Sequence, residues 1–310
     1  MTTAKAPSKT FLSSPLKGVR ILSLALNLPG PAALMRCRQL GASGVKLEPP
    51  SLEALQGTPP GASGDPMSWF SPSAYAALHQ GIRITVADLK TEKGQKILHR
   101  ELAKADLLLT SFRPSALIKL GLEWKALHKQ YPALSQVAIV GAPGERAEQP
   151  GHDLTYLACN DLVTGLDLPP TLYADMGGSL MASEAVLRAV MHQRSKAKGV
   201  YLEVALSEAA AWLALPRVWG LTTPGAAVGG GHAGYQVYKC QDGRVAVAAL
   251  EPHFAARLCA VAGVEAFGTK AMFALGTQQA IAAFFLTQTR QQLEGLAVEK
   301  DIPIHTLPKL

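Results

Sequence analysis

Three short segments bring ionisable side chains to points where a strand or a loop is expected to meet a helix. They are Gly-His-Asp at 151–153, Asp175 within Ala-Asp-Met-Gly-Gly, and Glu251 between a leucine and a proline. An imidazole and carboxylates are the groups that proteins use for proton transfer by a positioned acid and base. The segments lie far apart along the chain, so only the fold can bring them together.

Each segment, taken alone, also has a structural explanation. His152 and Asp153 are suited to cap the helix that follows, since Asp is a preferred residue before an apolar helical run. Asp175 before two glycines suits a turn, and Glu251 before Pro252 suits a first helical turn, where the macrodipole favours a carboxylate. Spacing alone therefore does not select a catalytic site.

Strand-like and helical patterns alternate up to about residue 205. Buried-strand patterns occur at 19–24, 44–47, 82–87, 106–111, 134–140 and 200–205. Helical patterns lie between them, for example at 32–40, which ends at Gly41, and from the capping residue Thr91 to about 104. This alternation predicts an α/β fold with a Rossmann-like, parallel sheet.

The remaining elements suggest a second, smaller domain. Further helices are expected at about 154–164 and 178–193 and from 208. The Gly-rich stretch 222–234 is predicted to be a linker, 235–251 a hairpin that turns at Gln-Asp-Gly, and everything from Pro252 helical. We therefore place a large α/β domain at 1–221 and a smaller α+β domain at 222–310.

The charge of the chain favours an anionic partner. Its formal net charge is +7 and its sequence pI is near 9.2. The basic residues are spread along the sequence, and no basic stretch is interleaved with aromatic residues for base stacking. We therefore expect no nucleic-acid partner and favour a small anionic ligand such as a nucleotide cofactor.

Several common site motifs do not apply. Gly229, Gly231 and Gly234 have the spacing G-x-G-x-x-G, but they precede a strand instead of linking a strand to a helix. No Walker A loop, H-E-x-x-H or G-x-S-x-G is present. Four widely separated cysteines lack metal-site spacing, so we predict no metal. Without a visible secretory signal or a long apolar run, we expect a cytoplasmic protein with no membrane segment.

The sequence segments around the ionisable residues resemble those of one family. Gly-His-Asp-Leu-Thr-Tyr, Tyr-Ala-Asp-Met-Gly-Gly-Ser and Ala-Leu-Glu-Pro-His-Phe, in this order, closely resemble three active-site segments of the α-methylacyl-CoA racemases. Other similar segments are Leu-Pro-Gly-Pro-Ala-Ala-Leu, Val-Ala-Asp-Leu-Lys, Thr-Ser-Phe-Arg-Pro and Tyr-Gln-Val-Tyr-Lys-Cys-Gln-Asp-Gly-Arg. From about residue 16 to residue 303, the chain is therefore similar to the superfamily of these racemases and the family III CoA-transferases (CaiB/BaiF).

The resemblance implies an acid and a base on opposite faces of one carbon. In these racemases a histidine and an aspartate exchange the α-proton of a 2-methylacyl-CoA through an enolate, which places the enzymes in lipid metabolism. Matched by position, His152 and Asp175 would be that pair. Glu251 would orient the imidazole, and Asp153 would support the site. Backbone N–H groups at a helix start, including those of Met-Gly-Gly after Asp175, would stabilise the enolate.

The resemblance also implies a handle for coenzyme A, which enters as part of the substrate, with no tightly bound cofactor. Arg113, Lys90 and Lys119 match positions near the CoA-binding groove, where cations meet phosphates. Ala87 and Tyr156 complete the expected binding set. Solvated surface side chains remain the alternative explanation for the two lysines.

Two other functions stay open. A family III CoA-transferase would use an aspartate at the position of Asp153 as a nucleophile and move CoA between carboxylic acids through an anhydride. A non-catalytic homologue would only bind CoA esters. Gly-His-Asp followed by Tyr156, together with Glu251, is the racemase pattern, so we favour the isomerase.

The fold implied is that of family III, with residues 1–221 as the CoA-binding domain and an interlocked homodimer as the assembly. Three departures bear on these expectations. The loop after Gly141 differs from the family's aromatic and Gly-Gln turn, and Pro49 replaces a basic residue. The chain also stops just beyond Asp-Ile-Pro-Ile, so we expect the family's C-terminal return segment to be missing.

Overall fold

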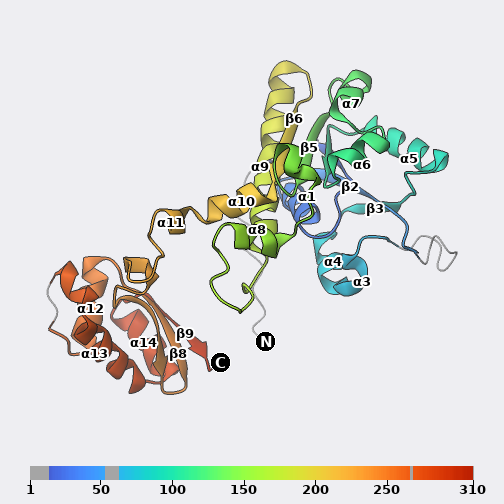
Figure 1. Ribbon diagram of the computed structural model, residues 1–310. Coiled ribbons are helices and arrows are strands. Elements are labelled where there is room, and N and C mark those ends of the chain that lie inside the picture. Colours follow the sequence, from blue (N-terminus) through green and yellow to red (C-terminus); the bar gives the residue numbers. More distant parts are fainter. Residues whose placement is uncertain (1–13, 53–62, 266–267, 310) are drawn as a thin grey trace. The chain divides into compact units, whose positions relative to one another are not determined.

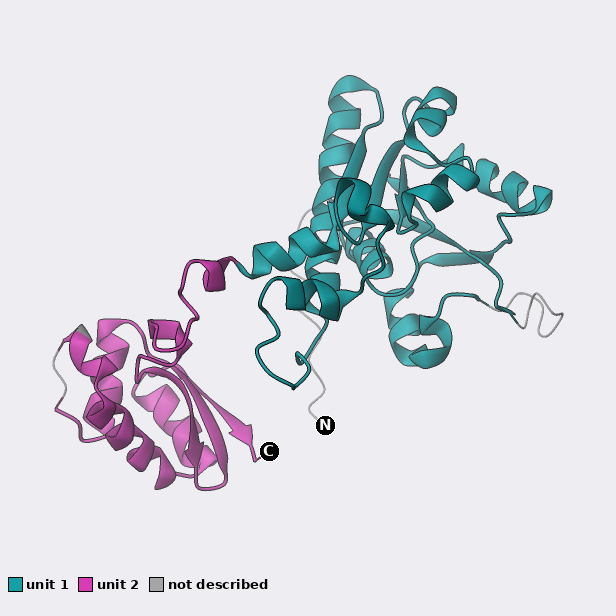
Figure 2. Ribbon diagram, in the orientation of Figure 1, with its two compact units in different colours: residues 1–214 teal, residues 215–310 magenta. Residues whose placement is uncertain are grey.

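The computed structural model describes residues 14–52, 63–265 and 268–309 and divides into two compact units. Unit 1 comprises residues 1–214 and unit 2 residues 215–310 (Figure 2). The predicted domain boundary at 221/222 lies a short way beyond this division. Within the described residues, none of the helices has the length and apolar content needed to cross a bilayer.

Unit 1 is built on a six-stranded parallel sheet. Its strands are β1 (Arg20–Ser23), β2 (Ser43–Glu48), β3 (Arg83–Val86), β4 (Leu107–Thr110), β5 (Ser135–Val140) and β6 (Tyr201–Ala205). Their spatial order is β3-β2-β1-β4-β5-β6, and every pair is parallel. The predicted α/β fold with a parallel sheet is thus confirmed. The order reverses between β1 and β4, and ligands of such sheets bind beside this reversal, at the carboxyl ends of the strands.

Helices cover both faces of this sheet, so that unit 1 has three layers (Figure 1). One face carries α1 (Pro29–Gln39), α8 (Asp153–Cys159), α9 (Tyr173–Lys196) and α10 (Leu206–Leu213). The other carries α5 (Glu92–Leu102), α6 (Pro114–Lys119) and α7 (Trp124–Gln130). Neighbouring strand residues feed opposite cores: Ile21 packs with the first group and Leu22 with the second.

Local signals set several of these boundaries. The Thr91 hydroxyl accepts a hydrogen bond of 3.1 Å from the Gly94 N–H and so caps α5, as predicted. Gly41, directly after the α1 C-cap, has a φ of +101°, which ends the helix where the sequence indicates. Helix α9 begins at Tyr173, whereas the sequence pattern predicts a start at residue 178. Between β2 and β3 lie α3 (Met67–Phe70) and α4 (Pro72–Leu78), and residues 53–62 of this stretch lie outside the described residues.

Unit 2 packs helices against a three-stranded antiparallel sheet. The strands β7 (Tyr235–Cys240), β8 (Gly243–Ala248) and β9 (Ile304–Pro308) lie in the order β7-β8-β9. The predicted hairpin is confirmed, with Cys240 opposite Gly243 across the turn. The prediction that the chain is helical throughout from Pro252 is wrong, because β9 pairs with β8.

The helical part of unit 2 supplies its core. The elements are α11 (Leu215–Val218), the 3-10 turns η2 (Ala227–Gly229) and η3 (Thr269–Phe273), α12 (Pro252–Val261), α13 (Leu275–Leu286) and α14 (Arg290–Glu299). Val245 and Val247 of the sheet are buried with Leu258 and Phe285 of the helices. Unit 2 therefore has a hydrophobic core of its own, as a folding unit requires.

Candidate active site

A cleft of about 260 Å³ opens in unit 1 at the carboxyl ends of β1, β4 and β5. It therefore lies at the point where the strand order reverses, the usual ligand position in this type of sheet. Its walls come from the segments that follow these three strands and from the starts of α8, α9 and α10. The lining residues used below are Asn27, Ser111, Arg113, His152, Tyr156 and Asp175.

His152 enters the cleft at the start of α8. It occupies the N-cap position in an extended conformation, with φ −142° and ψ 170°. Its N–H donates a 3.0 Å hydrogen bond to the Thr155 hydroxyl, and its C=O accepts from the same hydroxyl at 2.7 Å. The backbone at this helix start is thus fixed by Thr155, while the imidazole is exposed and faces the cleft.

Asp175 enters the same cleft from the first turn of α9. Its own N–H donates a 3.0 Å hydrogen bond to Oδ1 of Asp153, whose side chain is only 5% exposed. Asp153 therefore holds the start of α9, not the start of α8 as its structural explanation from sequence suggests. This contact joins the two predicted segments that carry His152 and Asp175.

The surroundings of Asp175 raise the pKa of its carboxyl group. Burial of its carboxyl group, together with the smaller effect of the Asp153 carboxylate, raises the pKa of Asp175 from 3.8 to about 6, while His152 opposes the shift. A carboxyl group with a pKa near 6 gives up and takes back a proton readily near neutral pH. Asp175 thus has the acid–base character that proton exchange requires.

Tyr156 lines the cleft and packs against two glycines. A Cβ atom added at Gly141 would lie 2.2 Å from the Tyr156 hydroxyl oxygen, and one at Gly151 would lie 2.6 Å from it. Glycine at both positions therefore lets the phenol ring pack directly against the backbone. Burial, together with the charge of Asp175, raises the pKa of Tyr156, and Arg113 opposes this.

Arg113 is the basic residue that the structure brings to the cleft. It is exposed and directly precedes α6, beside Glu148 of η1 (Gly144–Glu148). Glu148 accepts hydrogen bonds of 2.6 Å from the Ser115 N–H and 2.9 Å from its hydroxyl, and these lower the pKa of Glu148, with smaller effects from Arg113 and Lys119. Lys119 belongs to this surface group but does not line the cleft.

The other predicted residues lie elsewhere. Lys90 and Ala87 follow β3, and neither lines the cleft; Ala87 is buried and Lys90 is exposed. Glu251 belongs to unit 2, where it is exposed at the N-cap of α12. Its pairing with His152 stays a prediction.

The glycines after Asp175 serve packing and not anion binding. Both lie inside α9, where backbone N–H groups bond to carbonyls one turn back. A Cβ atom at Gly178 would lie 2.3 Å from the Leu206 side chain of α10, and one at Gly177 would lie 3.1 Å from Leu213. Their role is therefore the close approach of α9 and α10, contrary to the expectation that they meet the enolate.

Asn27 and Ser111, which also line the cleft, were not predicted from the sequence. Ser111 Oγ accepts a 3.2 Å hydrogen bond from the Leu26 N–H and joins the loops after β1 and β4. Asn27 has a left-handed backbone, with φ +62°. The signal for each was its position near the end of a predicted strand, Ser111 as the last residue of 106–111 and Asn27 just beyond 19–24, which is the ligand-binding edge of a parallel sheet.

Curated relatives include both CoA-transferases and racemases. The cinnamoyl-CoA:phenyllactate CoA-transferase of Clostridium sporogenes is 35% identical over 167 residues, 52% of this chain and 40% of that enzyme. The α-methylacyl-CoA racemase of Mus musculus is 30% identical over 268 residues, 81% of this chain and 65% of that enzyme. The chain thus spans 40% to 65% of the length of these two relatives.

Solved structures share the fold at lower identity. A hypothetical protein of Mycobacterium tuberculosis superposes with a TM-score of 0.75 at 21% identity, covering 94% of this chain and 85% of that chain. A CAIB/BAIF family protein of Brucella suis gives a TM-score of 0.75 at 23% identity, covering 94% and 83%. A model of the CoA-transferase family III matches residues 16–309. The chain belongs to CoA-transferase family III, whose members include α-methylacyl-CoA racemases.

Proposed function

We propose that the cleft takes an acyl-CoA thioester and racemises its α-carbon by proton exchange, with a 2-methylacyl-CoA as substrate. The observation that carries the proposal is the placement of His152 and Asp175 on one cleft, from the starts of two different helices. Racemisation needs two groups that each take or give one proton at the same carbon. A carboxyl group with a pKa of about 6 beside an imidazole suits that task.

The exchange conserves every atom of the substrate. One of the two groups removes the α-proton, the bonding electrons move into the thioester carbonyl to give an enolate, and the other group returns a proton to the opposite face. Asp153 supports this step in two ways: it fixes the Asp175 backbone, and its charge holds the pKa of Asp175 up.

The CoA portion is assigned to the basic side of the cleft, with no tightly bound cofactor. Arg113 would supply a guanidinium for a phosphate, and Tyr156 lines the cleft beside it. Lys90, Lys119 and Ala87 lie outside the cleft lining, so any contact of theirs with CoA would be with its distal part. Glu251 from unit 2 as the partner of His152, and a homodimer as the assembly, belong to the same proposal.

A CoA-transferase acting through Asp153 is the second candidate, favoured by relatives such as the Clostridium sporogenes enzyme. A nucleophilic carboxylate must reach the thioester carbonyl and form an anhydride with it. Asp153 is nearly fully buried, does not line the cleft and already accepts the Asp175 N–H. These contacts favour a supporting role, and hence the racemase.

The test is α-proton exchange in D₂O with a 2-methylacyl-CoA, followed by mass spectrometry. We expect the wild type to incorporate deuterium, and His152→Ala and Asp175→Ala each to reduce the rate by about 10²- to 10⁴-fold, the usual contribution of a positioned acid or base. Lys129→Ala is the control, since it removes an exposed charge of α7 that does not line the cleft and has no predicted contact with CoA. A wild type that instead moves CoA between two acids would support the transferase, and one that does neither would support a CoA-ester-binding protein.

A further inference from the structure

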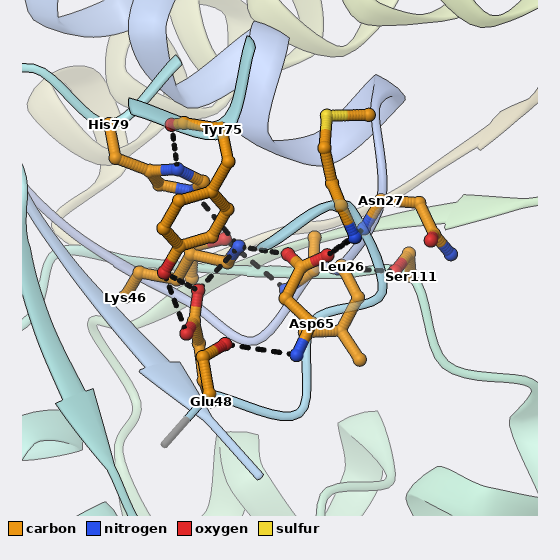
Figure 3. A network of polar contacts seen from close by, with 12 residues as sticks. Leu26, Asn27, Lys46, Glu48, Asp65, Tyr75, His79 and Ser111 are labelled. Carbon is orange, nitrogen blue, oxygen red and sulfur yellow. Dashed lines mark hydrogen bonds and ion pairs between the residues drawn. The ribbon is translucent and has the colours of Figure 1, made fainter. Parts of the chain in front are cut away.

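A buried ion cluster lies beneath the loop that carries Asn27. At its centre is Lys46 of β2, whose side chain is fully buried. Its ammonium nitrogen lies 2.8 Å from Glu48 Oε1, 2.5 Å from Asp65 Oδ2 and 2.9 Å from His79 Nε2 (Figure 3). An ammonium has three N–H donors, so each has one acceptor. We call Lys46, Glu48, Asp65 and His79 the Lys46 cluster.

The histidine of the Lys46 cluster is neutral. His79 Nδ1 lies 2.6 Å from the Tyr75 carbonyl oxygen and must donate to it, which leaves Nε2 as an acceptor for the ammonium. Burial and the nearby Lys46 charge lower the pKa of His79, consistent with this form. Glu48, Asp65 and His79 are close enough to hold a metal ion, but the ammonium already lies at their common point. The Lys46 cluster is therefore an internal salt bridge and not a metal site.

Asp65 connects the Lys46 cluster to the cleft. While its Oδ2 accepts from Lys46, its Oδ1 accepts a 3.2 Å hydrogen bond from the Asn27 N–H and a 3.0 Å bond from the Met67 N–H. The carboxylate thus holds the backbone of Asn27 from below. Lys46 fixes this carboxylate in turn. The position of Asn27 therefore depends on Asp65 and Lys46, two residues that do not line the cleft themselves.

Asn27 combines a constrained backbone with an unused amide. Its φ of +62° is a conformation that Asn adopts more readily than most residues, though it is uncommon for any residue except glycine. Among the described residues, none hydrogen-bonds its side-chain amide, which points away from Asp65 in Figure 3 and lines the cleft. A partly buried amide in a ligand cleft gains most from a polar ligand group.

We propose that Asn27 is a substrate-contacting residue of the cleft and that the buried Lys46–Asp65 pair positions it. The inference rests on the proposed acyl-CoA function, because it assigns the polar ligand group to an acyl-CoA. Asn27 donates to or accepts from that group through its amide. Asp65 is a positioning residue, since it acts only through the Asn27 backbone.

Two substitutions at Asn27 separate the amide from the backbone. Asn27→Gly removes the amide but keeps a residue that adopts a positive φ freely, whereas Asn27→Ala removes the amide and disfavours the backbone conformation. We expect both to raise KM for a 2-methylacyl-CoA two- to tenfold, as for the loss of one hydrogen bond, with kcat changed less than twofold. Alanine should have the larger effect.

The positioning role is tested with Asp65→Ala against a matched control. The control is Glu101→Gln, which replaces another buried carboxylate. Glu101 Oε2 lies 2.8 Å from an Arg83 guanidinium nitrogen, and Glu101 does not line the cleft. Hydrogen exchange of the peptide that contains Asn27, followed by mass spectrometry without ligand, should quicken at least tenfold in Asp65→Ala and stay unchanged in Glu101→Gln. KM should rise in the first variant and not in the second.

The outcomes are distinguishable. A wild type without α-exchange or acyl-CoA binding overturns the proposed function and the ligand contact together, and the exchange of the Asn27 peptide then still reports on the Lys46–Asp65 brace. If the wild type is active and both Asn27 variants keep its KM, the contact is wrong. If Asp65→Ala and Glu101→Gln speed exchange equally, the positioning role is wrong. Should Asp65→Ala fail to fold, Asn27→Gly and Asn27→Ala still decide the contact.

Discussion

The Lys46 cluster and the Asp153–Asp175 pair are both groups of buried or half-buried charges near the ends of parallel strands, but they are balanced differently. Lys46 has an acceptor for each of its three donors, and its two carboxylates share one ammonium. Asp153 and Asp175 lie together, and the charge that opposes the raised pKa of Asp175 is that of the exposed His152 imidazole. The first arrangement holds structure in place, while the second leaves one carboxyl group ready to bind a proton.

This contrast separates a structural cluster from a catalytic one on physical grounds. A buried charge is tolerated when it is paired and fully hydrogen-bonded, and is expensive when it is not. Burial of the charged Asp175 carboxylate lowers the free energy of unfolding. This cost is expected for an acid–base group with a raised pKa. Removing charge should therefore destabilise the Lys46 cluster and stabilise the Asp175 site.

The largest effect is expected for Lys46→Met. Without the ammonium, Glu48 and Asp65 become buried carboxylates without a cation, so we expect the free energy of unfolding to fall by about 3–5 kcal/mol. Urea unfolding at neutral pH measures the change. Lys96→Met is the control, because its partner Glu92 is exposed and the loss should stay near 0.5 kcal/mol. Equal effects of the two variants would remove the distinction between the clusters.

An effect of the opposite sign is expected for Asp175→Asn. In the folded protein the pKa of Asp175 is about 6, above its ordinary 3.8, so its contribution to stability is fully present below about pH 4 and is lost as the pH rises through 6. The variant does not suffer this loss. It should therefore be more stable than the wild type at pH 7.5, by up to about 3 kcal/mol for two pKa units, and the gain should vanish near pH 4.

Unfolding free energies at pH 4, 5.5 and 7.5 measure this gain. A variant less stable than the wild type at pH 7.5, or a difference that does not change with pH, would contradict the raised pKa. Activity gives an independent check, since the same variant should lose α-exchange while it gains stability.

Much of the fold was predictable because its signals are local. The strands of unit 1 are short runs of apolar residues between helical patterns, and Thr91 and Gly41 mark helix ends by their own chemistry. The errors have distant causes. Helix α9 begins five residues earlier than predicted because Asp153, 22 residues away, accepts a hydrogen bond at its first turn. Strand β9 is a short segment that follows Pro303 and ends on Pro308, and its pairing with β8 defines it.

The site, too, has residues that could be predicted from the sequence and residues that could not. The segments around His152 and Asp175 were found through a resemblance, and the structure brings both residues to one cleft. Asn27 was missed because its conformation depends on Asp65, 38 residues further along the chain. The contacts of Lys90 and Lys119 with CoA were predicted from their matched positions in the family. A matched position does not fix where a side chain lies, and neither lysine lines the cleft. The pairing of Glu251 with His152 remains a prediction.

The smallest effect is expected for Asp153→Asn, and it also separates the two candidate functions. The amide oxygen keeps an acceptor for the Asp175 N–H, so stability should change by less than about 1 kcal/mol. The like charge beside Asp175 is lost, and because that charge raises the pKa of Asp175, the pKa should fall. For a racemase, the acidic limb of kcat/KM for α-exchange then moves to lower pH while activity is retained.

A transferase gives the opposite result for the same variant. If Asp153 were the nucleophile, an amide in its place could not form the anhydride, and CoA transfer would be lost at every pH. The pH profile of Asp153→Asn, measured beside that of the wild type, therefore decides whether this carboxylate acts on the substrate or on Asp175. A retained activity with an unshifted limb would contradict the coupling between the two carboxylates, on which the comparison with the Lys46 cluster depends.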